Sequence, residues 1–597
     1  MADQQGSEYK FPDPIEVSKS LASIAERSQK LVSDFLERQT VDGSSMADSL
    51  SIGRAFLEMT ARLMTDPAKL VQAQMSLWQD YMQLWQSTAR RMMGEDAAPV
   101  IAPTPEDRRF RDPAWQENQL FDFIKQSYLL SARWLQSTVR QAEGLDDKTA
   151  KKVDFYTRQF VDALAPSNFV ITNPEVLRAT IESGGQNLLQ GLENLLADLE
   201  RGKGQLSIKM TDLEAFKLGE NIAVTPGKVV FQNDLIQLIQ YEPTTEKVMR
   251  RPLLIIPPWI NKYYILDLRE KNSFIRWAVA QGLTVFVISW VNPDSRLAAK
   301  TFEDYMFEGP LAALDAIEKA TGEREANVIG YCLGGTLLAC TLAYMAAKKI
   351  DRIVSATYFA ALVDFSEPGE LGVFIDEEQL AALEERMNEK GYLEGSAMAD
   401  TFNMLRANDL IWSFVINNYL LGKDPFPFDL LYWNSDSTRM PAAMHSFYLR
   451  NMYQKNLLVK PGGISLGGVP LDLRKIAQPT FILSAREDHI APWKTTYAAT
   501  RLYNGPIRFV LAASGHIAGI VNPPEANKYS HWTNTKLPPS PDEWLRTAKE
   551  HPGSWWPQWR KWIAKHGGGL VKARRPGDGA LQPIEDAPGS YVRVRAQ

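Results

Sequence analysis

The fold of this chain is decided by one short stretch of sequence, which reads Gly330-Tyr331-Cys332-Leu333-Gly334-Gly335. It follows an apolar run, residues 327–329, and opens a helix that we predict for residues 334–347. A strand, a tight turn and a helix in this order form a nucleophile elbow, here with cysteine in the usual position of serine. Glycines on either side let strand and helix approach closely, and a helix N-terminus favours a thiolate. We therefore predict that Cys332 is a catalytic nucleophile.

The other cysteine, Cys340, provides an internal comparison. It lies eight residues after Cys332 on the same predicted helix, roughly 12 Å away at a rise of 1.5 Å per residue. Cys340 therefore cannot share a site with Cys332. We expect it to be a buried packing residue, as most free cysteines are.

An elbow nucleophile needs an acid and a histidine, which follow it in that order along the chain. The acid is expected at the end of a late strand, and residues 481–488 end in Glu487-Asp488. We choose Asp488, with Glu487 as the neighbouring alternative. The histidine is expected in the loop after the last strand. Residues 510–516 end in Ser-Gly-His, which makes His516 the predicted base.

The remaining histidines compete less well for this role. His489 follows Asp488 directly and is predicted to flank the site. His445 lies in a large insertion, where packing or surface exposure is favoured over a place in the pocket. The last three, His531, His551 and His566, lie too late in the chain.

A tetrahedral intermediate on Cys332 needs two backbone N–H donors as an oxyanion hole. One is expected from Leu333, directly after the nucleophile. The other is expected from the loop after residues 253–256, which begins with two prolines that carry no N–H. The sequence leaves Trp259 and Ile260 open as the second donor.

Strand-like and helix-like runs alternate through the last two thirds of the chain, which indicates a mainly parallel sheet with helices on both faces. Together with the elbow, this order predicts an α/β fold of the α/β-hydrolase type. The predicted strands are residues 229–231, 235–241, 253–256, 284–289, 327–330, 353–359, 480–484 and 507–512, and the helices between them include 272–281, 303–320 and 334–347.

The first third of the chain is instead predicted to be mainly helical. After Pro67, apolar residues recur at alternating steps of four and three along one helical face: Val71, Met75, Trp78, Met82 and Trp85. A second stripe, Leu77, Tyr81 and Leu84, predicts that this helix packs on two sides. The first stripe would suit internal packing or contact with a partner. We predict a helical N-terminal domain over residues 1–204 and a catalytic domain over 205–597.

An aromatic-rich insertion, about residues 365–460, interrupts the strand–helix alternation. Its length between two sheet strands favours a lid or cap over the active site, and the alternative is a helical subdomain with its own core. A second aromatic group lies near the C-terminus and favours a helix packed by tryptophan side chains over a surface that contacts a partner: Trp555, Trp556, Trp559 and Trp562.

Composition excludes several classes of function. The 597 residues carry 66 Lys and Arg against 71 Asp and Glu, a net charge of −5, which argues against a general nucleic-acid binder. Two cysteines cannot build a Cys-rich metal site or a disulfide scaffold. Met1–Pro14 has no export signal and the apolar runs are too short to span a membrane. We expect a cytoplasmic protein with no metal and no cofactor.

At these motifs the sequence resembles the class I polyhydroxyalkanoate synthases over nearly its whole length. Besides the elbow, the resemblance rests on residues 257–268, 487–493 and 514–519, on Asp112–Asn118, and on the tail motifs 553–557 and 587–592. Small departures occur at Ala513 and at Ala360-Ala361, which do not touch the predicted triad.

The resemblance implies that Cys332, Asp488 and His516 form the catalytic triad. It implies polymerisation of (R)-3-hydroxyacyl-CoA, with 3-hydroxybutyryl-CoA as a typical substrate, into polyester with release of CoA. It also implies a homodimer at the surface of cytoplasmic storage granules, in contact with the growing polyester chain. The competing hypothesis is a thioesterase or polyester hydrolase that uses the same triad.

Overall fold

The computed structural model describes Arg27 and residues 44–596, so the stretch Met1–Pro14 lies outside the described residues. The chain divides into two compact units. Unit 1 comprises the residues up to Asp212 together with Phe402–Phe426, and unit 2 comprises Leu213–Thr401 and Pro427–Gln597.

The division differs in two respects from the predicted domains. We predict the boundary at residue 204, and the first unit extends to Asp212. We also predict residues 365–460 as one cap on the catalytic domain, whereas residues 402–426 group with unit 1. Tyr419 shows the reason, because its hydroxyl donates to Asp198 at 2.6 Å.

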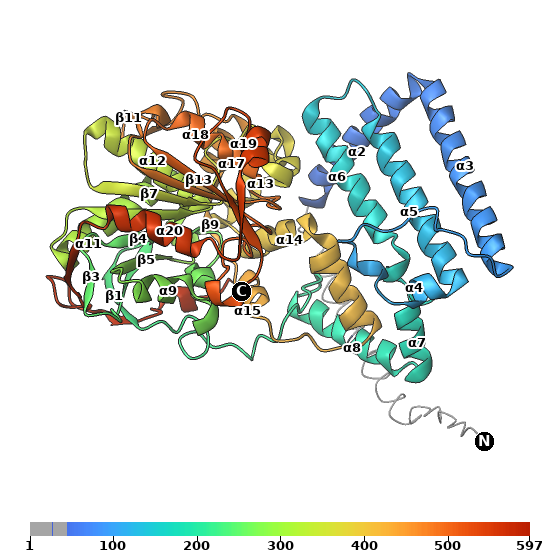
Figure 1. Cartoon of the computed structure of the whole chain (residues 1–597), viewed down its shortest axis with the longest axis horizontal. Coiled ribbons are helices and arrows are strands. Elements are labelled where there is room, and N and C mark those ends of the chain that lie inside the picture. The colour runs from blue at the N-terminus through green and yellow to red at the C-terminus, as the bar shows by residue number, and fades with distance from the viewer. Residues whose placement is uncertain (1–26, 28–43, 597) are drawn as a thin grey trace. The chain divides into compact units, whose positions relative to one another are not determined.

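Unit 1 is helical in its described part (Figure 1). Its helices are α2 (Ser44–Met64), α3 (Pro67–Met92), α4 (Ala114–Glu117), α5 (Gln119–Arg140), α6 (Asp147–Ala163), α7 (Pro174–Glu182) and α8 (Gln186–Arg201). Helix α14 (Gly395–Leu405) leads into the segment 402–426, whose later part forms the π-helical turns Asn408–Trp412 and Val415–Leu420.

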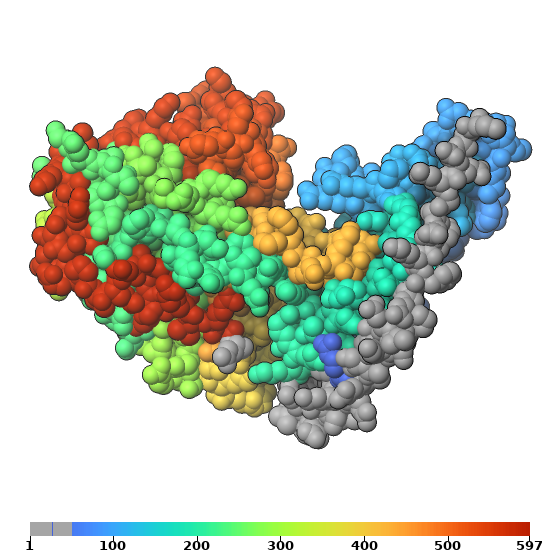
Figure 2. Space-filling model, turned by 90° about the horizontal axis from the view of Figure 1, so that it is seen from below, coloured from blue at the N-terminus to red at the C-terminus, as the bar shows by residue number. Residues whose placement is uncertain are grey.

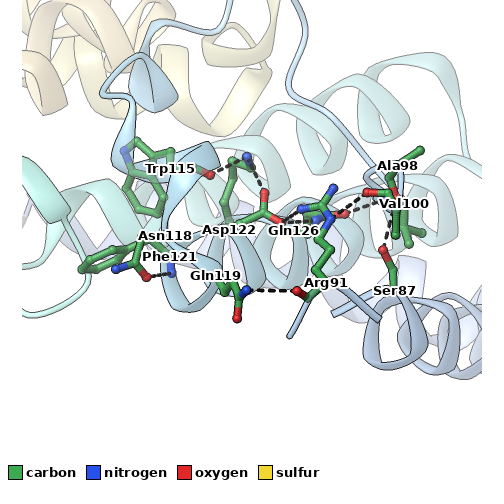
Figure 3. A network of polar contacts seen from close by, with 12 residues as sticks. Ser87, Arg91, Ala98, Val100, Trp115, Asn118, Gln119, Phe121, Asp122 and Gln126 are labelled. Atoms are coloured by element: carbon green, nitrogen blue, oxygen red, sulfur yellow. Dashed lines mark hydrogen bonds and ion pairs between the residues drawn. The ribbon is translucent and has the colours of Figure 1, made fainter. Parts of the chain in front are cut away.

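A buried polar network joins the C-terminal end of α3 to α5 (Figure 3). Arg91 donates to Asp122 at 2.6 Å, and Asp122 also accepts from Gln126 at 2.6 Å. Lys125 is a second cation 2.8 Å from Asp122, and it also donates to the Trp115 carbonyl at 2.7 Å. These contacts explain part of the motif Asp112–Asn118, which supplies a buried tryptophan and the N-cap of α5.

Among the described residues, helix α3 packs mainly through its second stripe, and of the first stripe Trp85 contacts Phe123, with ring centroids 5.0 Å apart. Leu84 is fully buried, and Tyr81 donates to the Ser127 carbonyl at 3.2 Å. The other stripe, Val71, Met75, Trp78, Met82 and Trp85, is 40–66% exposed. No described helix is long and apolar enough to cross a membrane.

Unit 2 is built on a sheet with eleven strands among the described residues, in the order β15-β14-β13-β12-β7-β6-β4-β5-β2-β1-β17. The middle six, from β13 to β5, run parallel, and the outer strands are antiparallel. The central strands are β4 (Leu253–Ile256), β5 (Val285–Trp290), β6 (Ala326–Tyr331), β7 (Ile353–Phe359), β12 (Thr480–Ala485) and β13 (Ile507–Ala512). The flanking strands are β1 (Gly227–Gln232), β2 (Ile236–Tyr241), β14 (Ser530–Thr533), β15 (Lys549–Pro552) and β17 (Glu585–Asp586).

The predicted strands are confirmed to within a few residues at their ends, because runs buried on both faces are easy to recognise. One predicted helix, residues 303–320, is broken. The structure has α10 (Phe302–Met306), a π-helical turn at Phe307–Leu311 and α11 (Ala312–Thr321). Gly309 has a non-helical backbone there, and Pro310 lacks the N–H that a continuous helix would need.

Helices pack against both faces of the sheet (Figure 1). On one face, α9 (Phe274–Ala280) and α20 (Trp556–Ile563) share a core with the strands. Trp555, Trp556 and Trp559 are buried in this core, which confirms the predicted tryptophan-packed helix. Helix α12 (Leu333–Lys348) contacts β4, β6 and β7 and is almost completely buried.

Unit 2 contains further α-helices and strands. The helices are α13 (Glu377–Lys390), α15 (Asp429–Asn434), α16 (Ala442–Tyr448), α17 (Trp493–Tyr497), α18 (Ala499–Leu502) and α19 (Pro541–Thr547). The small strands are β3 (Lys247–Met249), β8 (Tyr392–Leu393), β9 (Met440–Pro441), β10 (Ser465–Leu466), β11 (Val469–Pro470) and β16 (Leu570–Lys572).

Candidate active site

Cys332 lies in the sharp turn between β6 and α12, with φ 51° and ψ −119°. Positive φ is rare for a residue with a side chain, and it presents the thiol at the N-terminal end of the helix. The turn depends on glycine. A Cβ on Gly334 would lie 2.0 Å from the Ile256 carbonyl oxygen, and one on Gly330 would lie 2.5 Å from the Cα of Gly335.

Asp488 and His516 are directly hydrogen-bonded, with 2.6 Å between Oδ2 of Asp488 and Nδ1 of His516. The other carboxylate oxygen, Oδ1, accepts the backbone N–H groups of Ile490 and Ala491, both at 2.9 Å. The Asp488 side chain is fully buried, and that of His516 is 11% exposed. Both residues lie at the carboxyl ends of their strands, which is where ligand sites of parallel sheets occur.

The electrostatics of His516 connect it to the nucleophile. Burial of the ring lowers its pKa, but Asp488 and then Cys332 act in the opposite direction and raise the pKa well above 6.5. Cys332 contributes through both its charge and a hydrogen bond. The structure therefore brings Cys332, His516 and Asp488 together, and these neighbours favour the protonated form of His516.

Cys340 lies elsewhere, fully buried in α12. Burial raises the pKa of its thiol, which suits a packing residue and opposes thiolate formation. Its burial matches the expected packing role.

The other histidines take different places. His489 follows the acid, and its backbone carbonyl accepts the N–H of Glu370 at 3.2 Å. His445 is buried in α16, and burial lowers its pKa to about 4. His531 and His551 stack with ring centroids 5.2 Å apart on β14 and β15. His566 packs on Trp562 with centroids 4.7 Å apart.

The backbone donors predicted for an oxyanion hole lie on adjoining segments. Leu333 begins α12, and the close approach of Gly334 to the Ile256 carbonyl brings this turn beside the end of β4. The loop after β4 carries Trp259 and Ile260, both at least nine-tenths buried.

Three tyrosines near the site were not predicted from sequence. Tyr331 donates to the His516 carbonyl at 3.0 Å and so holds the histidine loop. Tyr448 and Tyr453 come from the insertion, and Cys332 is among the charges that affect the pKa of each, after burial. The only sequence signal for Tyr448 and Tyr453 was the aromatic richness of the insertion. That richness does not distinguish residues that face the active site from residues that pack in a core.

In the described part of the chain, no group of three or more His, Cys, Asp or Glu could hold a metal ion. The side chains that the structure brings together here are a cysteine at an elbow, a histidine and a buried carboxylate. The sheet order, the elbow and this arrangement define an α/β-hydrolase-fold protein with a cysteine in the nucleophile position.

Comparison with known proteins shows which family within this fold class the chain belongs to. A family model for the alpha/beta hydrolase fold matches residues 253–523, and a model described as the N-terminus of poly-beta-hydroxybutyrate polymerase (PhaC) matches residues 106–278. The poly(3-hydroxyalkanoate) polymerase of Methylorubrum extorquens is 54% identical over 94% of this chain and 93% of its own.

Two further relatives align over similar shares. The polymerase subunit PhaC of Rhizobium meliloti is 49% identical over 98% of this chain and 96% of its own. That of Cupriavidus necator is 44% identical over 90% of this chain and 91% of its own. The chain belongs to the poly(3-hydroxyalkanoate) polymerase family and is an enzyme.

Proposed function

We propose that this enzyme polymerises (R)-3-hydroxyacyl-CoA into polyester and releases CoA, through an acyl thioester on Cys332. The observation that carries the proposal is the Asp488–His516 hydrogen bond of 2.6 Å beside an elbow cysteine. Family membership supplies the type of polymer, and the cysteine supplies the chemistry. Acyl exchange between two thioesters is nearly balanced in free energy, because the two thiols have similar basicity.

Acylation begins from a thiolate on Cys332 whose proton rests on His516. The raised pKa of His516 supports this pairing. The thiolate attacks the acyl-CoA carbonyl, and the backbone N–H of Leu333 and one from the loop after β4 stabilise the oxyanion. The C–S bond to CoA then breaks, and the leaving thiolate takes the proton from His516 and departs as CoA thiol.

Chain growth needs a base for the 3-hydroxyl of an acyl unit, which attacks the next thioester. His516 is the better candidate, because both oxygens of Asp488 already accept hydrogen bonds and its side chain is fully buried. Asp488 then acts through His516 and stabilises its charged form. Water must be excluded from the thioester, and the insertion tyrosines Tyr448 and Tyr453 supply aromatic cover.

The setting of the reaction is part of the same proposal. We expect short-chain substrates such as 3-hydroxybutyryl-CoA, as in the class I enzymes that the sequence resembles. We also expect a homodimer that works at the surface of cytoplasmic polyester granules. Sedimentation velocity tests the dimer, and fluorescence microscopy of a tagged chain in polymer-forming cells tests the location.

The deciding experiment uses purified enzyme and (R)-3-hydroxybutyryl-CoA, with thiol release and product size measured together. Wild type is expected to release CoA and form insoluble polymer. Cys332→Ala is expected to abolish both, whereas Cys340→Ala, the matched control, retains them. Free hydroxy acid without polymer would support the hydrolase hypothesis instead, and full CoA release by Cys332→Ala would overturn the mechanism.

A further inference from the structure

The last described residues, 591–596, run along unit 2 as a C-terminal strap. In Figure 2 the red C-terminal residues lie beside the green segments of the same unit. The Tyr591 backbone N–H donates to Gln237 at 3.0 Å, and its hydroxyl donates to the Asn233 carbonyl at 2.6 Å. Val592 is fully buried. The strap is therefore an integral part of the unit and is held by specific contacts.

Lys262 connects this strap to the loop after β4. Its Nζ donates to the Val594 carbonyl at 2.6 Å, and Asn292 donates to the same oxygen at 3.3 Å. Lys262 is only 2% exposed. Burying an ammonium group is costly, so a lysine at this position calls for a specific role.

The charges around Lys262 come from several segments. Burial lowers its pKa to about 8, Asp436 opposes that shift, and Arg595 and Arg439 add to it. Asp436 is itself buried and accepts the hydroxyl of Tyr264 at 2.8 Å. Among the described charged groups that act on this ammonium, Asp436 is thus the one carboxylate, and the ammonium donates a hydrogen bond to the strap.

The same loop carries the candidate oxyanion donors, two and three residues before Lys262. Thr438 fixes the carbonyls of this loop: its hydroxyl donates to the Trp259 carbonyl and its N–H donates to that of Ile260 at 3.1 Å. A trans peptide is planar, so its C=O and the next N–H point in opposite directions. Fixing the Trp259 carbonyl on Thr438 therefore aims the Ile260 N–H away from Thr438. These contacts fix the peptide plane that carries the Ile260 N–H, and we take Ile260 as the second donor.

The loop is held on both sides of these donors. Trp290 donates to the Pro257 carbonyl at 2.8 Å before them, and Trp433 donates to the Lys262 carbonyl at 2.7 Å after them. Lys262 adds the link to the strap through its side chain.

We propose that Lys262 is a positioning residue for acyl transfer, which ties the strap to the loop and so holds the Ile260 N–H where the oxyanion forms. The inference rests on the proposed Cys332 chemistry. An oxyanion donor contributes about 10²–10³ in rate, so a displaced donor should cost a substantial part of that factor.

The test compares two reactions of Cys332 by intact-protein mass spectrometry. Acylation by 3-hydroxybutyryl-CoA passes through an oxyanion, whereas alkylation by iodoacetamide does not. Lys262→Met is expected to slow acylation about 10-fold or more, with alkylation within 2-fold of wild type. Lys262→Arg, which keeps the charge and a donor, is expected to restore most of the acylation rate.

The matched control is Lys228→Met. Lys228 pairs with Asp586, also near the C-terminus, but at strands β1 and β17, and its replacement should leave both rates unchanged. Equal loss of acylation and alkylation in Lys262→Met, or no loss of acylation, would overturn the inference. Failure of the proposed function would give a different result, and it would be seen in the wild type. The wild-type enzyme would then be acylated without forming polymer, or would not be acylated at all.

Discussion

Asp488 is the most completely satisfied side chain of the site, with two backbone donors on one oxygen and His516 on the other. Its carboxylate raises the pKa of His516 and selects the tautomer that carries a proton on Nδ1. A replacement that puts a donor in place of Oδ2 is therefore expected to disturb His516.

Asp488→Asn is expected to lower kcat for CoA release by about 10²–10⁴, because an amide N–H would face the ring nitrogen. The pKa of His516, followed by NMR of labelled histidine, is expected to fall. Glu487→Gln is the matched control, since it removes the neighbouring carboxylate that the sequence offered as an alternative acid. Similar losses in both variants would contradict the assignment of Asp488.

His445 makes stability depend on pH. Its pKa is lowered from 6.5 to about 4 by burial, so between these values the unfolded chain binds more protons than the folded one. Stability therefore falls as pH drops below about 6.5, by about 2 kcal/mol at pH 5, and is unaffected above it. His445→Met should remove this loss.

The measurement is the difference in Tm between His445→Met and wild type at several pH values. We expect the difference to shift in favour of the variant from pH 7 to pH 5, and to stay constant from pH 7 to pH 9. A difference that is constant over the whole range would show that His445 is not titrating in this way.

At the scale of elements, the parallel core could be predicted from sequence because each strand is a short apolar run. The elbow could be located because glycine is required on both sides of Cys332. The break at Gly309-Pro310 could have been read from Pro310 alone. The exposure of the apolar stripe on α3 could not be predicted, because periodicity identifies an apolar face and does not say what covers it.

The attachment of α3 depends on the network around Asp122, which faces two cations at 2.6 and 2.8 Å. Asp122→Ala leaves the buried Lys125 and the partly buried Arg91 with only backbone-carbonyl acceptors, at an expected cost of about 3 kcal/mol. Hydrogen exchange of α3 should speed up markedly. Asp80→Ala is the control, because its pair with Arg133 is half-exposed and should contribute below about 1 kcal/mol. Equal exchange in the two variants would contradict this role.

At the scale of the whole molecule, the order of elements was predictable, but membership of the units was not. Residues 402–426 read as part of a cap because they lie between two sheet strands. Their partners are far away in sequence: Asn187 donates to the Leu420 carbonyl at 2.7 Å, and Asn194 donates to that of Asn418 at 3.0 Å. A single sequence contains no signal for such distant pairs.

Removal of residues 1–212 should therefore leave the segment 402–426 without its partners. We expect limited trypsin digestion to cut the truncated chain rapidly at Arg406 or Lys423, and to cut the full-length chain there slowly. Peptide mass spectrometry identifies the sites. Protection of this segment in the truncated chain would show that it folds without the N-terminal helices.

The return of the chain to unit 1 at Phe402–Phe426 also sets an order of events on the ribosome. The helices of unit 1 emerge first, yet the segment that Gly191 packs against, at the carbonyl of Tyr419, is made only after the whole stretch 213–401. The first-made part of the protein must wait, incomplete, while much of the sheet is synthesised. Nascent chains commonly fold domain by domain from the N-terminus. Here the N-terminal unit can be completed only after much of the following unit has been synthesised.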